Sequence, residues 1–266
     1  MQLLLSLQDI SYAYHNLKGE TPALSHISFD VSQGEFLAIV GPSGCGKSTL
    51  LSIIAGLLAP ESGKLLYKEH CLSDCAPNDT LKIGYMLQRD HLFEWRTIYQ
   101  NVVLGLELNH TLTPQNRNYV MQLLEDYGLY AFKDKKPSEL SGGMRQRAAL
   151  IRTMAIHPDL LLLDEPFSAL DSQTRLNVSA DIAQIIRETH KTAILITHDL
   201  AEAITLADRV LVLSKRPAGV KCEMPIHFTV DRNNPMDVRG TADYQLYFNQ
   251  LWEVLTHEQT VGQSAG

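Results

Sequence analysis

A glycine-rich segment at residues 41–49 carries the clearest chemical signal in the sequence. It follows the apolar run at residues 36–40, as a phosphate-binding loop follows a buried strand. Glycines let backbone N–H groups close around phosphate oxygens, Lys47 adds positive charge, and the Ser48 hydroxyl can reach Mg²⁺. The apolar residues 50–58 predict a buried helix whose N-terminus faces the anion. Together these features predict binding of a nucleoside triphosphate by Gly41, Pro42, Ser43, Gly44, Cys45, Gly46, Lys47, Ser48 and Thr49.

Further polar residues stand at the ends of other apolar runs. Gln88 follows the run at 81–87, Asp164 and Glu165 follow 160–163, and His198 comes shortly after 193–196. Apolar strands that alternate with helical patterns indicate a parallel sheet covered on both faces, and ligands bind beyond the carboxyl ends of such strands. A lone Gln or His at a strand end is usually an ordinary loop residue. The occurrence of polar residues at the ends of all these strands is what indicates a ligand site. Asp164 can hold Mg²⁺ through its water shell, and Glu165 can act as general base on the attacking water.

The pattern of apolar residues places the elements that must position these groups. Short strands predict a small antiparallel sheet beside the nucleotide at 3–14, 27–31 and 64–67. Core strands are predicted at 81–87, 160–163, 193–196 and 210–213. One long helix is predicted at 172–188. Residues 97–157 read as a compact helical insertion, in which Thr113 and Pro114 open a helix with Val120, Leu123, Leu124 and Tyr127 on its apolar face.

Composition excludes several classes of function. The 266 residues carry a net charge of −7, which offers no broad basic field for nucleic acid. The apolar stretches are far shorter than the roughly 18 residues that a membrane span needs. The first seven residues lack a basic region and a cleavage site, so they predict an edge strand and not a signal peptide. Among the C-terminal residues, only 262–266 have a composition typical of disorder.

The cysteines are Cys45, Cys71, Cys75 and Cys222, too few and too scattered for a disulfide framework. Cys71 and Cys75 lack a second ligand pair, so two ordinary loop thiols are favoured over a zinc site. A reduced cytosol fits this pattern. Cys45 lies near a helix N-terminus and Lys47, which predicts a lowered thiol pKa and a reactive thiol; the alternative is a buried, inert one.

Residues 140–147, Leu-Ser-Gly-Gly-Met-Arg-Gln-Arg, resemble the signature motif of the ABC ATPases. The order of phosphate loop, Gln88, this motif, residues 160–166, residues 168–171 and residues 197–199 matches that family along residues 3–215. The resemblance implies an α/β P-loop NTPase fold, with a RecA-like parallel sheet core, an antiparallel β subdomain and a helical ABC subdomain at about 90–157. It also implies an ATPase domain at 1–220 and a C-terminal tail at 221–266. Within the tail, the apolar residues Tyr244, Tyr247, Phe248, Leu251, Trp252 and Leu255 stand at helical spacing. This spacing predicts an amphipathic helix at about 241–256, packed on the body or on a partner chain, in preference to a ligand site.

The resemblance also implies roles for individual residues. Tyr14 would stack on adenine, Gln88 would be the Q-loop residue, and His198 would be the switch histidine that contacts the γ-phosphate. The implied catalytic residues are Glu165, His198, Gln88 and Lys47. The implied Mg²⁺ ligands are Ser48, Gln88 and Asp164. Further implied nucleotide contacts are Ser141, Gly142, Gly143 and the D-loop aspartate Asp171.

A second anion cradle at residues 141–143 implies a partner chain. Ser-Gly-Gly alone would be a flexible turn, but in this family it closes over the ATP of a second protomer. Two chains, identical or paralogous, would then pair head to tail and form two composite sites. The resemblance further implies ATP hydrolysis with ATP and Mg²⁺, integral membrane permease subunits, an external solute-binding protein, and a peripheral location on the cytoplasmic face of the cell membrane.

Residues 90–97 and 101–108 look like the ATPase subunits of nitrate, sulfonate and taurine-type importers. Arg216-Pro217 and residues 230–255 of the tail are similar to them too. Glu94 departs from the proline usual there, and Ile151 and Thr153 replace alanines, which bears on the substrate but leaves hydrolysis intact. By resemblance, Phe93 and Trp95 would dock a short helix of the membrane subunit; the alternative is that Trp95 packs inside its own domain.

The sequence bears on three rival functions. A soluble ABC protein of translation or DNA repair would need a second cassette or a long coiled coil between Lys47 and Ser141, and the sequence has neither. An exporter subunit differs mainly in its membrane partner and stays open. A non-catalytic regulator would be expected to lack Glu165 or His198.

Overall fold

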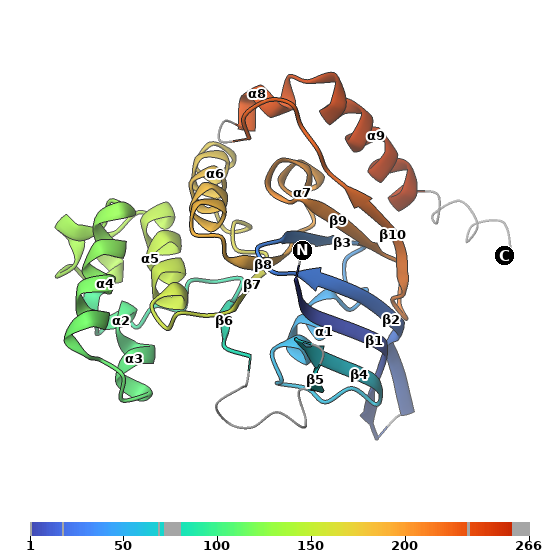
Figure 1. The fold of residues 1–266 in the computed structure, drawn as a ribbon, viewed down its shortest axis with the longest axis horizontal. Coiled ribbons are helices and arrows are strands. Elements are labelled where there is room, and N and C mark those ends of the chain that lie inside the picture. The colour runs from blue at the N-terminus through green and yellow to red at the C-terminus, as the bar shows by residue number, and fades with distance from the viewer. Residues whose placement is uncertain (1, 18, 69, 72–80, 233–234, 257–266) are drawn as a thin grey trace, which may run out of the picture. The chain divides into compact units, whose positions relative to one another are not determined.

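The computed structural model describes residues 2–17, 19–68, 70–71, 81–232 and 235–256 (Figure 1). The chain divides into two compact units, the first made of Met1–Leu81 with Ile186–Gly266 and the second of Lys82–Ile185. Within the described ranges, none of the helices combines the length and the apolar character that crossing a membrane requires. Cys75 and residues 262–266 lie outside the described residues. The prediction of disorder at 262–266 therefore concerns residues that the structure does not describe, and the prediction of two ordinary loop thiols at Cys71 and Cys75 depends on one such residue, Cys75.

The first unit contains the predicted antiparallel sheet. Its strands are β1 (Leu3–Asn16), β2 (Gly19–Ser32), β4 (Ser62–Tyr67) and β5 (His70–Cys71), in the order β2-β1-β4-β5. The prediction of an edge strand at the N-terminus is wrong, because Leu5 on β1 pairs with Val31 on one side and with Tyr67 on the other. The run of buried leucines at positions 4, 5 and 7 is typical of such an inner strand.

A second sheet of the first unit holds the predicted core strands. β10 (Val220–Pro225), β9 (Arg209–Leu213), β3 (Phe36–Val40) and β8 (Thr192–Ile196) lie side by side in this order. β3 runs parallel to β8 and to β9, and all residues of β3 and β8 are buried, which explains their unbroken apolar sequences. β10 is antiparallel to β9 and was not predicted. Its half-buried Val220, Cys222 and Met224 alternate with exposed neighbours, so a period-two signal was present.

Helices cover this second sheet. α1 (Lys47–Ile54) follows β3, and it ends earlier than residue 58, where the prediction placed its end. Gly56 adopts a left-handed conformation (φ 72°) that closes the helix, and Leu57 is 67% exposed. α7 (Leu200–Leu206), α8 (Pro235–Arg239) and α9 (Ala242–Thr256) follow later in the chain, and α9 packs on α7 (Figure 1). Tyr244 and Leu251 of α9 are buried in a cluster with residues of α7, β3 and β9.

Two arginines close the C-terminal end of α7. Arg187 donates hydrogen bonds to the carbonyls of Thr205 (3.2 Å) and Leu206 (3.0 Å). Arg232 donates to the carbonyls of Thr205 and Ala207 and forms an ion pair with Asp208. Cations at this position satisfy carbonyls that the helix leaves free and interact favourably with its dipole. Burial lowers the pKa of Arg187 to about 10, which still leaves it charged at neutral pH.

The second unit pairs two parallel strands with helices (Figure 1). β6 (Ile83–Met86) and β7 (Leu160–Asp164) were both predicted, and Ile83 lies opposite Leu160. The helical region contains α2 (Ile98–Val102), α3 (Leu104–Leu108), α4 (Pro114–Asp126), the 3₁₀ turns η2 (Tyr130–Phe132) and η3 (Pro137–Glu139), and α5 (Gly142–Met154). α6 (Ser172–Glu188) starts in the second unit and ends in the first. Thr113 caps α4 and the predicted apolar face of that helix is buried, as expected.

Candidate active site

The phosphate-binding loop lies in the first unit, between β3 and α1. Gly46 is the N-cap residue of α1, and it has no side chain that could bind the N–H groups of the first helical turn. Gly46 has a φ of 127°, and a Cβ atom there would lie 2.9 Å from the Ala23 carbonyl oxygen. Only glycine adopts this positive φ without strain and leaves room for the Ala23 carbonyl oxygen. The backbone N–H groups therefore remain directed at the space in front of the helix, where an anion binds favourably.

Lys47 adds a buried positive charge to this loop. Its ammonium group donates hydrogen bonds to the carbonyl oxygens of Gly41 and Pro42, each at 2.9 Å. These acceptors are neutral, so they satisfy the hydrogen-bonding capacity of the ammonium without compensating its charge. Helix N–H groups and a buried cation on neutral acceptors fit the phosphate groups of a nucleotide.

Cys45 does not have the lowered pKa that the sequence predicts. The residue is buried, and burial raises the pKa of its thiol above the usual value. The charge of Lys47 and nearby backbone N–H groups act in the opposite direction, but their effect is smaller. Burial disfavours the thiolate, so the alternative of an inert thiol is the one that the structure supports.

Tyr14 and His198 are the other predicted site residues of the first unit. The Tyr14 hydroxyl lies 3.0 Å from the hydroxyl of Thr49 on α1, so the exposed ring stands beside the helix of the phosphate loop. His198 is exposed and follows β8, whose carboxyl end lies at the same edge of the sheet as that of β3.

The turn that carries His198 is built on buried polar groups. The Thr197 hydroxyl donates a hydrogen bond to the Glu202 carboxylate (2.6 Å) and accepts one from the Asp199 N–H (3.0 Å). The Asp199 carboxylate in turn accepts from the N–H groups of Ala201 and Glu202 at the start of α7. Thr197 and Glu202 are buried, so this arrangement fixes the backbone on both sides of His198.

The second unit brings Gln88, Asp164 and Glu165 to the carboxyl ends of β6 and β7. The Gln88 side-chain N–H₂ lies 3.4 Å from a Glu165 carboxylate oxygen and 3.4 Å from the Ser168 hydroxyl. Ser168 donates to the Glu165 carbonyl at 2.9 Å. Glu165 has a φ of 45°, a conformation that costs free energy for a residue other than glycine and that occurs at functional sites. Asp164 is the last residue of β7 and is partly buried.

The signature segment also lies in the second unit, where it begins α5. The Ser141 hydroxyl accepts from the Met144 N–H at 3.3 Å and caps the helix. A Cβ atom on Gly143 would lie 3.0 Å from the Val178 side chain, so this glycine permits close packing of α5 on α6. Asp171 accepts from the Thr174 N–H at the start of α6, and hydrogen bonds from Thr174 lower the pKa of its carboxyl.

The donor types at the predicted metal ligands suit Mg²⁺. Ser48 offers a hydroxyl, Gln88 an amide oxygen and Asp164 a carboxylate, all of which are oxygen donors of the kind that Mg²⁺ prefers. Within their own units, Ser48 and Gln88 are exposed and Asp164 is partly exposed.

Sequence reasoning missed several residues that hold the site. Glu202 stands three residues after Asp199, a spacing typical of a capping box, but its carboxylate binds Thr197 instead. Asn101 is fully buried and binds the loop after Gln88. A polar residue among apolar positions of a predicted helix was the available signal for Asn101.

Comparisons with known proteins agree with this assignment of elements. A family model for ABC transporter matches residues 24–168. The ABC transporter ATP-binding protein YtlC of Bacillus subtilis is 43% identical over 252 residues, which cover 94% of this chain and 95% of YtlC. The taurine import ATP-binding protein TauB of Roseobacter denitrificans is 40% identical over 258 residues, covering 94% of each chain.

Solved structures show the same fold. The ATP-binding cassette MJ0796, a dimer bound to ADP and Pi, superposes with a TM-score of 0.71 at 29% identity, over 85% of this chain and 100% of that one. The cbiO1 protein from Clostridium perfringens, part of the ABC transporter complex cbiONQ, has a TM-score of 0.74 at 26% identity, over 98% and 100% of the two chains. The chain therefore belongs to the ABC transporter ATP-binding proteins, a family that binds ATP, and is an ATPase with the P-loop NTPase fold.

Proposed function

We propose that the phosphate loop holds the triphosphate of ATP, with Lys47 as the principal cation and Tyr14 stacked on adenine. The buried ammonium of Lys47 supports this assignment, because its present acceptors are neutral carbonyls. The exposed ring of Tyr14 supports the second part, because its hydroxyl lies against Thr49 at the start of α1.

Hydrolysis would be carried out by Glu165 as general base. The observation that carries this proposal is the contact of the Gln88 side chain with the Glu165 carboxylate at the carboxyl ends of β6 and β7. Asp164, Gln88 and Ser48 would hold Mg²⁺, which neutralises developing charge on the phosphates when it is bound. His198 would contact the γ-phosphate, and the hydrogen bonds of Thr197 would keep it in place.

The second half of each ATP site would come from another copy of the chain or a paralogous ATPase. Ser141 and Asp171 are exposed, and Gly142 is partly so, which leaves them accessible to a partner. MJ0796 forms a dimer in its solved structures. A head-to-tail dimer would place the residues of this signature segment, 141–143, and Asp171 against the nucleotide of the partner chain.

The substitution Glu165→Gln tests the catalytic assignment. It removes the base while keeping the size of the side chain and its ability to accept a hydrogen bond, so we expect ATP turnover to fall at least about 100-fold with nucleotide affinity retained. ATP-dependent dimers should accumulate, as measured by size-exclusion chromatography. The matched control is Glu125→Gln on the exposed face of α4, which should leave turnover unchanged. Turnover of Glu165→Gln within a few-fold of wild type would remove Glu165 from this role.

We further propose that the chain powers an importer for a small solute of the nitrate, sulfonate or taurine class, on the cytoplasmic face of the membrane. The 40% identity with TauB supports this class, and cbiO1 belongs to a transporter complex. The aromatic pair of Phe93 and Trp95 would dock the membrane permease subunit. Trp95 is 72% exposed and Phe93 is 36% exposed, so the pair offers an apolar surface to a partner. An external solute-binding protein would deliver the solute.

The substitution Trp95→Ala separates docking from packing. Because most of the Trp95 side chain is exposed, we expect the thermal midpoint and the basal ATPase activity to stay unchanged while co-purification with the permease is lost. Trp252→Ala, at an exposed tryptophan of α9, is the control for loss of an aromatic surface residue. A large drop in midpoint for Trp95→Ala would instead assign it to packing. The co-purifying membrane proteins also decide between importer and exporter.

A further inference from the structure

The segment at residues 90–97 joins Gln88 to the aromatic pair. The rings of Phe93 and Trp95 are 4.8 Å apart between centroids and tilted by 42°. A loop that only displayed two aromatic rings would need few internal contacts. Instead, polar side chains of the second unit bind both ends of this segment.

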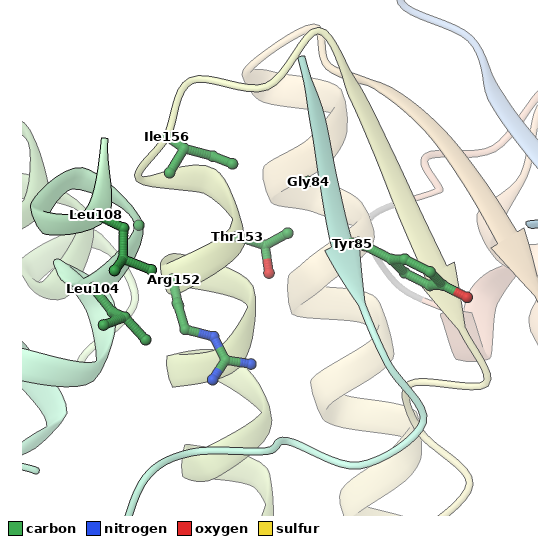
Figure 2. Close-up of a pocket in the computed structure, with 8 residues that line it drawn as sticks. Gly84, Tyr85, Leu104, Leu108, Arg152, Thr153 and Ile156 are labelled. Atoms are coloured by element: carbon green, nitrogen blue, oxygen red, sulfur yellow. The ribbon is translucent and has the colours of Figure 1, made fainter. Parts of the chain in front are cut away.

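Two arginines of α5 hold the first part of the segment. Arg152 donates one hydrogen bond to the His91 carbonyl and one to the Asp90 carbonyl, both at 2.7 Å. Figure 2 shows its side chain extending from α5 towards the chain that leaves β6. Arg145 forms an ion pair with the Asp90 carboxylate at 3.1 Å and also donates to the Leu140 carbonyl at 2.9 Å. Arg145 and Arg152 are seven residues apart, about two helical turns, and so face the same side of α5.

The remaining contacts leave a sharp boundary in the chain. The Asp90 carboxylate also accepts from the Leu92 N–H at 3.1 Å, and the side chain of Asn101 binds the backbone of Phe93. By contrast, Gln88 is exposed and its side-chain contacts are long, at 3.4 Å. Fixed backbone therefore begins at Asp90, immediately after Gln88 and Arg89.

We propose that Arg145 and Arg152 are positioning residues that make residues 90–97 a rigid extension of α5. Arg145 contacts Asp90 on one side and the carbonyl of Leu140, directly before Ser141, on the other. A displacement of the aromatic surface then moves the Ser141 end of α5 with it. The backbone at Gln88 and Arg89 acts as a hinge, so that the Gln88 side chain can move independently of residues 90–97. This inference rests on the proposed function in so far as residues 141–143 contact a nucleotide.

The first test needs no nucleotide. Hydrogen–deuterium exchange is measured by mass spectrometry on the full chain for Arg152→Gln, Arg152→Lys and Asp90→Asn. We expect amides of residues 91–97 to exchange at least tenfold faster in Arg152→Gln and in Asp90→Asn. Arg152→Lys should show a smaller effect, because one ammonium can still reach a carbonyl. Lys135→Gln is the control, since it removes an exposed ion pair with Glu139 in the same unit. Exchange within twofold of wild type in both test variants would overturn the proposal.

The second test measures transmission. Replacing Trp252 by Phe leaves Trp95 as the sole tryptophan of the chain, and Glu165→Gln is added to collect ATP-bound dimers. We expect the quenching of Trp95 by acrylamide to change on dimer formation. The further substitution Arg152→Gln should reduce that change at least fivefold while altering ATP affinity by less than twofold.

The outcomes of the second test are distinct. Two results would contradict the proposed connection between residues 90–97 and α5. One is a change in Trp95 quenching that is as large in Arg152→Gln as without this substitution. The other is Trp95 quenching that is the same in monomers and in ATP-bound dimers. Absence of ATP-dependent dimers would contradict the proposed function instead, and the exchange experiment then decides this inference alone. If Arg152→Gln does not fold, Asp90→Asn serves in both tests, because it retains the hydrogen bonds from Arg152 to the backbone.

Discussion

Asn101 offers a quantitative test of how the loop after Gln88 is held. It is 0% exposed, and its carbonyl oxygen accepts from the Phe93 N–H at 2.7 Å. Its amide nitrogen donates to the carbonyls of Phe93, Arg96 and Thr97 at 3.0 to 3.3 Å. At about 1 kcal/mol for each bond, and with buried partners left unsatisfied, Asn101→Ala should lower the free energy of unfolding by roughly 3 to 4 kcal/mol. For a chain of this size, that corresponds to a fall of roughly 6 to 16 °C in the thermal midpoint.

Asn101→Asp separates hydrogen bonding from volume, because it keeps the shape and replaces the donor by an acceptor. Burial beside carbonyl oxygens should raise the folded-state pKa of the new carboxyl above its unfolded value of about 3.9. The loss of stability should then be smallest near pH 4 and grow as the pH rises through the folded pKa.

Thermal denaturation between pH 4 and pH 8 measures both variants. Asn109→Ala, at an exposed asparagine, is the matched control and should shift the midpoint by at most about 2 °C. A shift of that size for Asn101→Ala would refute the reasoning. A midpoint shift for Asn101→Asp that does not vary with pH would show that the new carboxyl is solvated.

Two further predictions concern the first unit. At pH 8, Cys45 should react with iodoacetamide more slowly than the partly exposed Cys222, and the labelling rate of Cys45 should still rise above pH 9, because burial raises the pKa of its thiol. Peptide mass spectrometry measures the labelling of each cysteine. Faster labelling of Cys45 than of Cys222 would contradict this prediction. Thr197→Val should lower the kcat for ATP hydrolysis about tenfold with little change in KM, because it removes the hydroxyl that ties the turn of His198 to Glu202. Thr197→Ser keeps this hydroxyl and should retain activity. Equal kcat values for the two variants would show that the hydroxyl does not position His198.

The sequence predicted most of the sheet architecture because its signals are local. The runs at 160–163 and 193–196 are fully buried strands, and the glycine positions of the phosphate loop leave few alternatives for its backbone. The helix at 172–188 was predicted with the bounds that the structure has, since its apolar spacing is regular. Errors arose where partners decide the outcome. Whether β1 is an edge or an inner strand depends on β4, which is distant in the sequence.

The site illustrates the same limit. The order of motifs identifies Gln88 and Glu165, but only coordinates show the contact between their side chains. For Cys45, neighbouring residues suggested a lowered pKa, whereas burial raises it. Desolvation depends on every element packed around a group, and a single sequence does not list those elements.

The arginines at the end of α7 set a limit on how the chain can be shortened. α7 begins two residues after His198, and Arg232, far downstream, binds the carbonyls of Thr205 and Ala207 at the other end of the helix. A protein truncated after β10 would therefore lose one of the two cations that cap this helix. Arg187 would be left to bind the Thr205 and Leu206 carbonyls alone. A minimal ATPase fragment should accordingly extend beyond Arg232, and changes in the length of the segment between β10 and Arg232 must preserve its reach to α7.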